Sequence, residues 1–486
     1  MLITKTNYVA GLQCPKFLWH RVHEPESLIS DEIDGPPVLR IGQDVGMLAQ
    51  SLFPDGVAIA STLPIKERIA ATIQALSGRK PIYEAAVSAG DLYAQIDILV
   101  PDRAGWAIVE VKSTTEVKEH FIKDVAFQQY VCIKAGLNIR RSSVVTLNKD
   151  YIKKGPLNIT KLFANHSADA EVNEAIRKVP GDISRIRKVL AGKCPKVGIG
   201  HHCSDPINCP LTERCWAFLP VNNVFELSRI GGKAFDLLAA GIVKITDIPE
   251  DFKLTKYQTI QIKSTKSRRP QVDADAIRDF LSELEYPIRF FDFETFSMPV
   301  PVFDGTKPYQ QIPFQYSMHV VTAPRAKPSH YSYLAEGRDD PRPGLLNSLK
   351  ANIGTTGTIL AFNMAFEEAR MKEMAATFPS HKAWIHAALK RLNDLIIPFR
   401  KGAYYHPRQH GSNSLKIIMP ALTTLSYDYL PIADGSTAGQ EFMRVTYGNV
   451  TKAEEKRIRG HLLRYCGQDT GGMIDILKEL FKLATN

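Results

Sequence analysis

The hydrophobic pattern of the first part of the chain alternates between helix and strand. Apolar residues recur at helical spacing over Asp44–Phe53 and again over Lys123–Ala135. Between these segments, Tyr93–Val100 and Trp106–Lys112 are rich in β-branched and aromatic residues and are separated by a short turn. A further strand is predicted over Arg141–Leu147. This order of hairpin, helix and strand predicts an α/β domain whose mixed sheet contains a helical crossover.

The pattern changes twice in the remainder of the chain. Apolar residues between 221 and 284 recur at roughly helical spacing, which predicts a small helical connector. The last part opens with a strand over Ile288–Glu294 and closes with two predicted helices, Lys452–Gln468 and Gly471–Leu483. A chain of 486 residues is too long for one core. We therefore expect three parts, at residues 1–220, 221–284 and 285–486.

Composition narrows the class of protein. Hydrophobic residues make up 44% and charged residues 23%, which is typical of a globular protein and not of a disordered or fibrous one. No apolar run is long enough to span a bilayer, and the first residues do not resemble a secretory signal, so we expect a cytoplasmic protein with no membrane partner. Lys and Arg number 61 against 51 Asp and Glu, a net charge of +10 that suits a polyanion such as nucleic acid.

Paired carboxylates lie on the first strand of the last part. Strand alternation puts Asp292 and Glu294 on one face, where two like charges repel unless a divalent cation lies between them. Near the C-terminus, Tyr465 and Asp469 are four residues apart on one helix face. Between them, an apolar strand over 360–366 runs into a helix that carries Glu367.

These three motifs, in this order, resemble the DnaQ-like (DEDD) exonucleases, which have an RNase H-like fold. In that family four acids hold two divalent metal ions that activate water and stabilise the leaving oxygen of a phosphodiester. The resemblance implies that Asp292, Glu294, Glu367 and Asp469 bind metal and that Tyr465 orients the water. The family usually has Asp where this chain has Glu367, and Glu368 and Asp394 are competing acids.

A second carboxylate group is predicted in the first part. Glu110 and Lys112 share one face of a strand, and Asp97 lies on the adjoining strand across a short turn. The set resembles the acid, acid and lysine of the RecB-like PD-(D/E)XK nucleases, a restriction-endonuclease-like fold, and implies a second metal-dependent phosphodiesterase site. The stretch Gly42–Gly46, where that branch often has a metal-binding His on an early helix, contains no His.

Seven cysteines in a cytoplasmic protein point to metal binding rather than to disulfides. Cys203, Cys209 and Cys215 are separated by five residues each, and Cys14 lies far upstream. One early and three late cysteines resemble the iron–sulfur members of the RecB-like group, which implies a [4Fe–4S] cluster on these four thiolates. Zinc is the alternative, because four thiolates also suit a tetrahedral zinc ion.

Taken together, the residues predict a nuclease that uses Mg²⁺ or Mn²⁺ to hydrolyse nucleic acid. The RecB-like resemblance favours DNA over RNA, and single-stranded ends as the substrate. The alternative is a nucleic-acid-binding module of a repair or defence complex, with one or both carboxylate centres inactive.

Overall fold

The structure is a computed structural model that describes residues 2–28 and 44–485. Contacts divide the chain into two compact units. The N-terminal unit consists of Met1–Phe218 and Met298–Gln310, and the C-terminal unit consists of Leu219–Ser297 and Gln311–Asn486. The predicted connector therefore belongs to the same compact unit as the last part of the chain.

A seven-stranded sheet forms the centre of the N-terminal unit. Its path runs β2 (Val57–Ala58), β3 (Ile82–Ala89), β4 (Leu92–Asp102), β5 (Gly105–Val111), β6 (Ile139–Leu147) and β7 (Phe163–Ser167), with β1 (Ile3–Thr4) beside β4. β4 and β5 form the predicted antiparallel hairpin, and β6 lies parallel to β5. Helix α5 (Glu119–Lys134) makes the crossover between these parallel strands. The predicted order of hairpin, helix and strand is confirmed.

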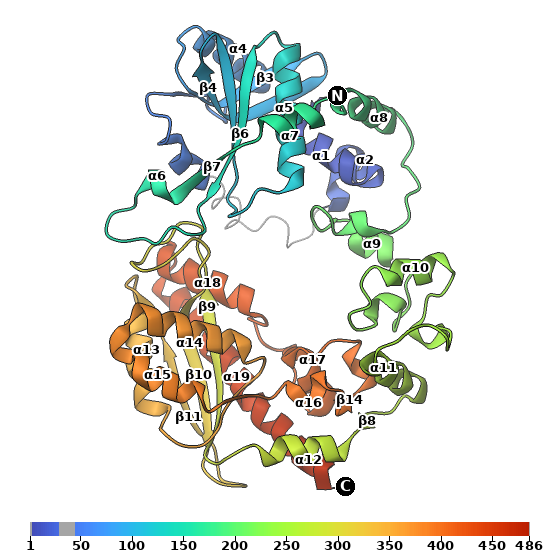
Figure 1. Ribbon diagram of the computed structural model, residues 1–486, viewed down its shortest axis with the longest axis vertical. Coiled ribbons are helices and arrows are strands. Elements are labelled where there is room, and N and C mark those ends of the chain that lie inside the picture. The colour runs from blue at the N-terminus through green and yellow to red at the C-terminus, as the bar shows by residue number, and fades with distance from the viewer. Residues whose placement is uncertain (1, 29–43, 486) are drawn as a thin grey trace. The chain divides into compact units, whose positions relative to one another are not determined.

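Helix α5 is the central helix of this unit, as Figure 1 shows. Its residues Val125, Phe127 and Val131 are fully buried in a core shared with β3, β4 and β5. Other helices in the described part of this unit are α1 (Lys5–Gln13), α2 (Pro15–His23), α4 (Ile65–Leu76), α6 (Ile159–Leu162), α7 (Asp169–Ala175), α8 (Val179–Ala191) and α9 (Thr212–Trp216), and residues 44–50 are helical as well. The segment 298–310 joins this unit through Val300 and through Tyr309, whose hydroxyl donates to the Ser113 carbonyl.

A five-stranded mixed sheet organises the C-terminal unit. The strand order is β11 (Ser329–Leu334), β10 (Ile312–Val321), β9 (Ile288–Phe296), β12 (Ile359–Ala361) and β13 (Leu392–Asp394). β9 is antiparallel to β10 and parallel to β12. The predicted strand at the start of the last part is therefore the central strand of its sheet. A separate pair, β8 (Gln271–Val272) and β14 (Tyr404–Tyr405), lies apart from it.

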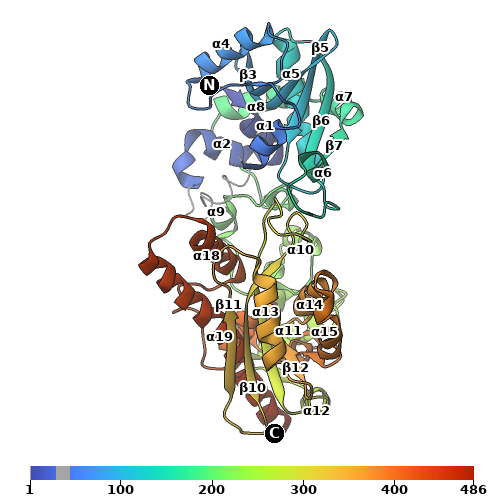
Figure 2. The same ribbon diagram turned by 90° about the vertical axis from the view of Figure 1, so that its left-hand side faces the viewer.

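Helices cover both faces of this sheet (Figure 2). Phe291 and Phe293 of β9 point into an apolar core with α13 (Pro341–Asn352), α14 (Ala365–Thr377) and α15 (Lys382–Leu389). The opposite face packs against α18 (Gly435–Tyr447) and α19 (Lys452–Thr485). The remaining helices are α10 (Lys233–Ala239), α11 (Lys256–Ser267), α12 (Ala274–Ser282), α16 (Ile397–Arg400) and α17 (Leu415–Leu422). Alternation along β9 thus sends Phe291 and Phe293 to one layer, and Asp292 and Glu294 to the other.

The prediction of two C-terminal helices was wrong, because α19 is one helix of 34 residues. The second of the two predicted helices begins at Gly471, next to Gly472. In the structure, however, a Cβ on Gly472 would lie 2.0 Å from Cε of Met419, so this glycine provides space for a neighbouring helix. Tertiary packing therefore offsets the low helix propensity of glycine.

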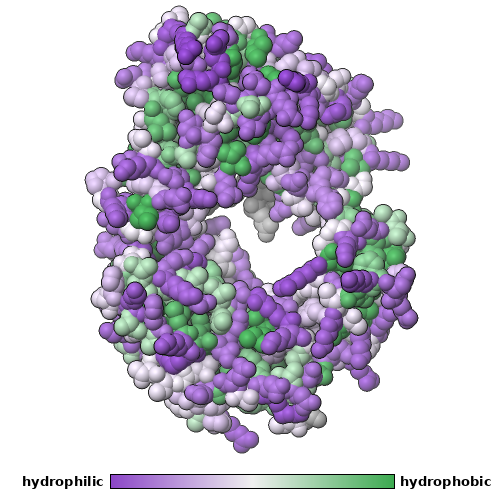
Figure 3. All heavy atoms as spheres, viewed as in Figure 1, coloured by the Kyte–Doolittle hydropathy of each residue, from purple (hydrophilic) through white to green (hydrophobic). Residues whose placement is uncertain are grey.

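The surface visible in Figure 3 is covered mainly by hydrophilic side chains, with hydrophobic residues scattered among them. Among the residues that the structure describes, none of the helices combines the length and apolar character needed to cross a membrane.

A glycine allows α18 to lie close to the strand that carries the paired acids. A Cβ on Gly439 would lie 2.8 Å from the Thr295 carbonyl oxygen, which is closer than a carbon atom can approach. We predict that Gly439→Ala lowers the free energy of unfolding by about 1–3 kcal/mol, because α18 must shift away from β9.

The matched control is Gly460→Ala in α19, where nothing lies within 4 Å of the added methyl group. This helical substitution should be neutral or stabilise the protein by up to about 1 kcal/mol. Urea unfolding of both variants checks the prediction, and equal stability of the two would contradict it.

Candidate metal centre and basic pocket

Four carboxylates from three elements form what we call the C-terminal centre. Asp292 and Glu294 come from β9, Glu367 from the first turn of α14, and Asp469 from α19. Glu294, Glu367 and Asp469 are 5%, 2% and 6% exposed. The structure thus brings together the four acids that the sequence pattern identified.

Burial and mutual repulsion change the acidity of this centre. Burial, then the charges of Glu294, Asp469 and Glu367, raise the pKa of Asp292 well above its usual range. Burial and the charge of Asp469 do the same to the pKa of Glu294. Burial raises the pKa of Glu367 to about 8 and that of Asp469 to about 7. Four acids with raised pKa values lie close together here, and a bound cation would stabilise their ionised forms.

Two tyrosines hold Asp469. The hydroxyls of Tyr427 and Tyr465 both hydrogen-bond to this carboxylate, and burial together with the charge of Asp469 raises the pKa of each tyrosine. Tyr465 was expected here from its spacing to Asp469. Tyr427 was not, because it lies 42 residues away in a segment with no motif of its own.

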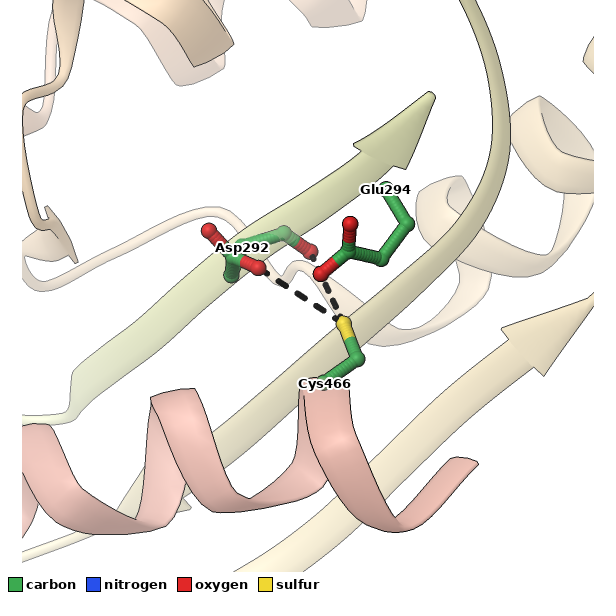
Figure 4. A group of neighbouring side chains, drawn as sticks. All are labelled: Asp292, Glu294 and Cys466. Carbon is green, nitrogen blue, oxygen red and sulfur yellow. Dashed lines mark hydrogen bonds between the residues drawn. The ribbon is translucent and has the colours of Figure 1, made fainter. Parts of the chain in front are cut away.

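Cys466 is a second unexpected neighbour. Its Sγ lies 3.7 Å from Oδ2 of Asp292, and one ligand atom from each of Asp292, Glu294 and Cys466 lies within 4.8 Å of the others. Figure 4 shows the sulfur reaching from α19 toward the two carboxylates of β9. Sequence spacing alone gave no reason to select this cysteine, because it has no partner cysteine at a regular interval.

Glu368 and Asp394, the two further acids of this region, lie in different environments from Glu367. Glu368 is paired on the surface with Lys372 at 2.6 Å, whereas Oε2 of Glu367 is buried without a hydrogen-bond partner. Asp394 accepts the backbone N–H groups of Asn363 at 2.8 Å and Ile396 at 3.1 Å, so it fixes the chain after β12 and β13. Glu367 is therefore the acid of this region that is available to a ligand.

A cavity of about 690 Å³ opens beside the C-terminal centre. Asp292, Tyr465 and Asp469 line it, together with three cationic side chains, Arg229, Arg400 and Lys416. Asn363 orients Arg400 by accepting a hydrogen bond from Nη2 at 2.8 Å. Acids and cations in one cavity form a site suited to an anion held beside a bound metal ion.

The N-terminal centre, consisting of Asp97, Glu110 and Lys112, is also assembled. Nζ of Lys112 lies 2.6 Å from Oε1 of Glu110 and 2.9 Å from Oδ2 of Asp124 on α5. Asp97 accepts the Val111 N–H at 2.7 Å, and Gln128 of α5 donates to Oε2 of Glu110 at 2.7 Å.

Lys5 distinguishes this centre from the C-terminal one. Its Nζ lies 2.8 Å from Oε1 of Glu110, so the fully buried Glu110 is paired with two lysines. Burial alone would raise the pKa of Glu110, but the charges of Lys112 and Lys5 hold it below its ordinary value. Burial and the charge of Glu110 raise the pKa of Asp97 to about 7. The ammonium groups of two lysines thus already balance the negative charge of Glu110, as a bound cation would.

The four predicted cysteines lie together in the N-terminal unit. Cys14, Cys203, Cys209 and Cys215 line one small pocket, beside Lys16 and His202. Burial raises the pKa of the Cys14 and Cys209 thiols, and the neighbouring cysteines add to the effect. A backbone hydrogen bond of 2.8 Å from Cys209 to Cys203 closes the loop that carries two of them. The stretch that could carry an early metal-binding His lies partly outside the described residues, at Gly42 and Gln43.

Comparison with known proteins gives two matches. The family described as a domain of unknown function (DUF2779) matches residues 289–414, which include Asp292, Glu294 and Glu367 but end before Asp469. An uncharacterized protein of Mycoplasma genitalium is 24% identical over 207 residues, which are 39% of this chain and 31% of that protein. The chain therefore spans less than a third of the length of this curated relative.

The pairing of Lys5 with Glu110 makes a prediction about stability. Lys5→Met should lower the free energy of unfolding of the N-terminal unit by about 3 kcal/mol, because the buried Glu110 loses one of its two cations. The control is Lys123→Met, which breaks an exposed pair with Glu119 one turn away and should leave the stability nearly unchanged. Thermal and urea unfolding measure both effects, and a Lys5 variant as stable as the control would contradict the pairing.

The raised pKa of Glu367 makes a prediction about pH. In metal-free protein this residue holds its proton up to about pH 8, whereas an unfolded glutamate releases it near its ordinary pKa of 4.5. The folded state binds the extra proton between these values, so stability falls as pH rises, by up to about 1.4 kcal/mol per pH unit. Glu367→Gln removes this titration.

The measurement is urea unfolding in a chelator at several pH values between those two pKa values. The stability of Glu367→Gln relative to the unsubstituted protein should rise steadily with pH. A difference that does not change with pH would contradict the assignment of a protonated Glu367.

Proposed function

We propose that this protein is a metal-dependent nuclease whose reaction centre is the C-terminal centre. The observation that carries the proposal is the burial of Glu294, Glu367 and Asp469 beside Asp292. Such a cluster is costly unless divalent cations bind it. Oxygen ligands favour hard cations, so Mg²⁺ or Mn²⁺ is the expected metal.

The ligand atoms of the C-terminal centre fit a divalent metal ion. Asp292, Glu294, Glu367 and Asp469 would hold the metal, and the unsatisfied Oε2 of Glu367 is a buried acceptor that needs a partner. Bound divalent metal supplies a water of lowered pKa and charge for the developing oxyanion of a phosphodiester. Tyr427 and Tyr465 keep Asp469 in place, and Tyr465 also lines the cavity where the attacking water would be oriented.

The substrate class follows from the cavity. Arg229, Arg400 and Lys416 offer charged donors for phosphate oxygens at its wall. The volume of about 690 Å³ accommodates the terminal nucleotide of a single strand rather than a duplex. The sheet order, with both paired acids on the central strand, supports an RNase H-like fold and a relationship to the DEDD exonucleases. We propose DNA as the substrate on the RecB-like resemblance of the N-terminal unit.

The N-terminal unit is proposed to have a restriction-endonuclease-like fold, with α5 crossing between β5 and β6 beside the Asp97, Glu110 and Lys112 set. The pairing of Glu110 with Lys5 and Lys112 favours a second candidate function for this unit alone. With its carboxylate charge already compensated, the unit would bind nucleic acid for the other unit or for a repair or defence complex without cleaving it.

We further propose that Cys14, Cys203, Cys209 and Cys215 hold a [4Fe–4S] cluster. All four cysteines line one pocket, and four cysteine thiolates are the usual ligands of such a cluster. An iron assay and a visible absorption spectrum after anaerobic purification test this assignment, and zinc in place of iron would overturn it.

The proposed function is tested by Mn²⁺-dependent degradation of labelled single-stranded DNA, with RNA in parallel. We expect Glu367→Gln and Asp292→Asn each to lower the rate by at least about 100-fold, because each removes a metal ligand. Glu368→Gln is the matched control and should retain full activity, since Glu368 is paired on the surface with Lys372.

Lys112→Ala separates the two centres. Activity that survives in this variant and is lost in Asp292→Asn assigns cleavage to the C-terminal centre. The opposite pattern assigns it to the N-terminal centre. Binding of DNA without cleavage in Mg²⁺ or Mn²⁺ would overturn the proposal and leave the binding function.

A further inference from the structure

One side chain of the C-terminal centre is unusual for a magnesium site. Cys466 is fully buried, and its sulfur lies 3.7 Å from Oδ2 and 4.0 Å from the backbone oxygen of Asp292. It precedes Asp469 by three positions in α19, which places both side chains on the helix face that packs against β9. The helix that supplies the fourth acid therefore also points a sulfur at the first two.

Glu294 supplies an independent sign of a ligand at this point. It is 5% exposed and makes no side-chain hydrogen bond among the described residues, although its carboxylate points toward the same space as the sulfur (Figure 4). A buried carboxylate without a donor is costly, and a cation held jointly with its neighbours removes that cost. The thiol alone would not do so, because S–H is a weak donor.

We propose that Cys466 is a third protein ligand beside Asp292 and Glu294, and that these three residues bind a cation of the zinc class in preference to Mg²⁺. The proposal deepens the proposed function, on which it rests for the presence of a cation at this centre. It concerns one of two cation positions. Glu367 and Asp469 remain ligands of the other position, whose ligands are oxygen atoms.

The distances agree with this assignment. A tetrahedral ion with bonds of about 2.3 Å to sulfur and about 2.0 Å to oxygen separates these two ligand atoms by about 3.5 Å. The observed separation between Sγ and Oδ2 is 3.7 Å. Thiolate is a soft ligand that selects zinc, cobalt or cadmium over magnesium, whereas a carboxylate accepts either kind of cation. The sulfur of Cys466 is therefore the ligand that sets the preference for a zinc-class cation over Mg²⁺.

Cobalt(II) is the probe for this site, because sulfur ligation gives a charge-transfer absorption that oxygen ligation does not. The full-length protein is titrated with Co²⁺ under anaerobic conditions. Each spectrum is taken as a difference from the same sample before addition, so the group held by the four cysteines is subtracted. We expect a thiolate band that is lost in Cys466→Ser and weakened in Glu294→Gln. Cys132→Ser, which removes an equally buried thiol in α5, should retain it.

Competition titrations give the second readout. Cys466→Ser should weaken Zn²⁺ binding by at least about tenfold and leave Mg²⁺ binding nearly unchanged. Cys466→Ala serves the same purpose if the serine variant fails to fold.

The outcomes separate this inference from the proposed function. Co²⁺ or Mn²⁺ binding that requires Asp292, with the same spectrum and affinity in Cys466→Ser, overturns the sulfur ligand and leaves the metal centre. If no divalent cation binds in a way that depends on Asp292, both the sulfur ligand and the proposed metal centre are overturned.

Discussion

Repulsion among buried carboxylates is the constraint around which the C-terminal unit is arranged. Two unit charges about 5 Å apart interact by roughly 3 kcal/mol at the effective dielectric constant typical of proteins. Asp292, Glu294, Glu367 and Asp469 combine several such pairs with the cost of burial, and the raised pKa values are the direct sign of this cost. In the absence of metal the fold can keep these groups only by holding protons on them. Divalent cations would convert the same arrangement into a stabilised site.

The N-terminal centre resolves the same problem differently. There two lysines lie within hydrogen-bond distance of one buried glutamate, and the glutamate stays ionised without any metal. The two centres have similar sequence patterns, since each pattern predicts acids at neighbouring positions of a sheet. Their charge balance separates them, and it is the physical reason for proposing the C-terminal centre as the reaction centre.

Elements with strong periodicity could be predicted from the sequence. The hairpin, the crossover helix α5 and the strand β9 were all expected, because strand alternation and helical spacing are local properties. The four acids of the C-terminal centre were expected from the resemblance of three motifs to the DEDD exonucleases, and the structure brings these acids together. The single long helix α19 was missed, because the sequence pattern does not show that Gly472 admits the side chain of Met419.

Residues that act through distant contacts could not be predicted in this way. Lys5 reaches Glu110 across 105 positions, and Tyr427 reaches Asp469 across 42. Neither residue type nor spacing marks either of them. Cys466 stands directly beside Tyr465 in the sequence, yet only its distance to Asp292 shows that it belongs to the centre. The basic wall of the cavity likewise joins the connector residue Arg229 to Arg400 and Lys416.

The most direct test of this account is a crystal of the protein grown with Mn²⁺ and measured at an X-ray energy where manganese scatters anomalously. The account predicts anomalous density within bonding distance of acids of the C-terminal centre, which are Asp292, Glu294, Glu367 and Asp469. A peak elsewhere, or no peak while these carboxylates hydrogen-bond to one another in protonated form, would contradict it.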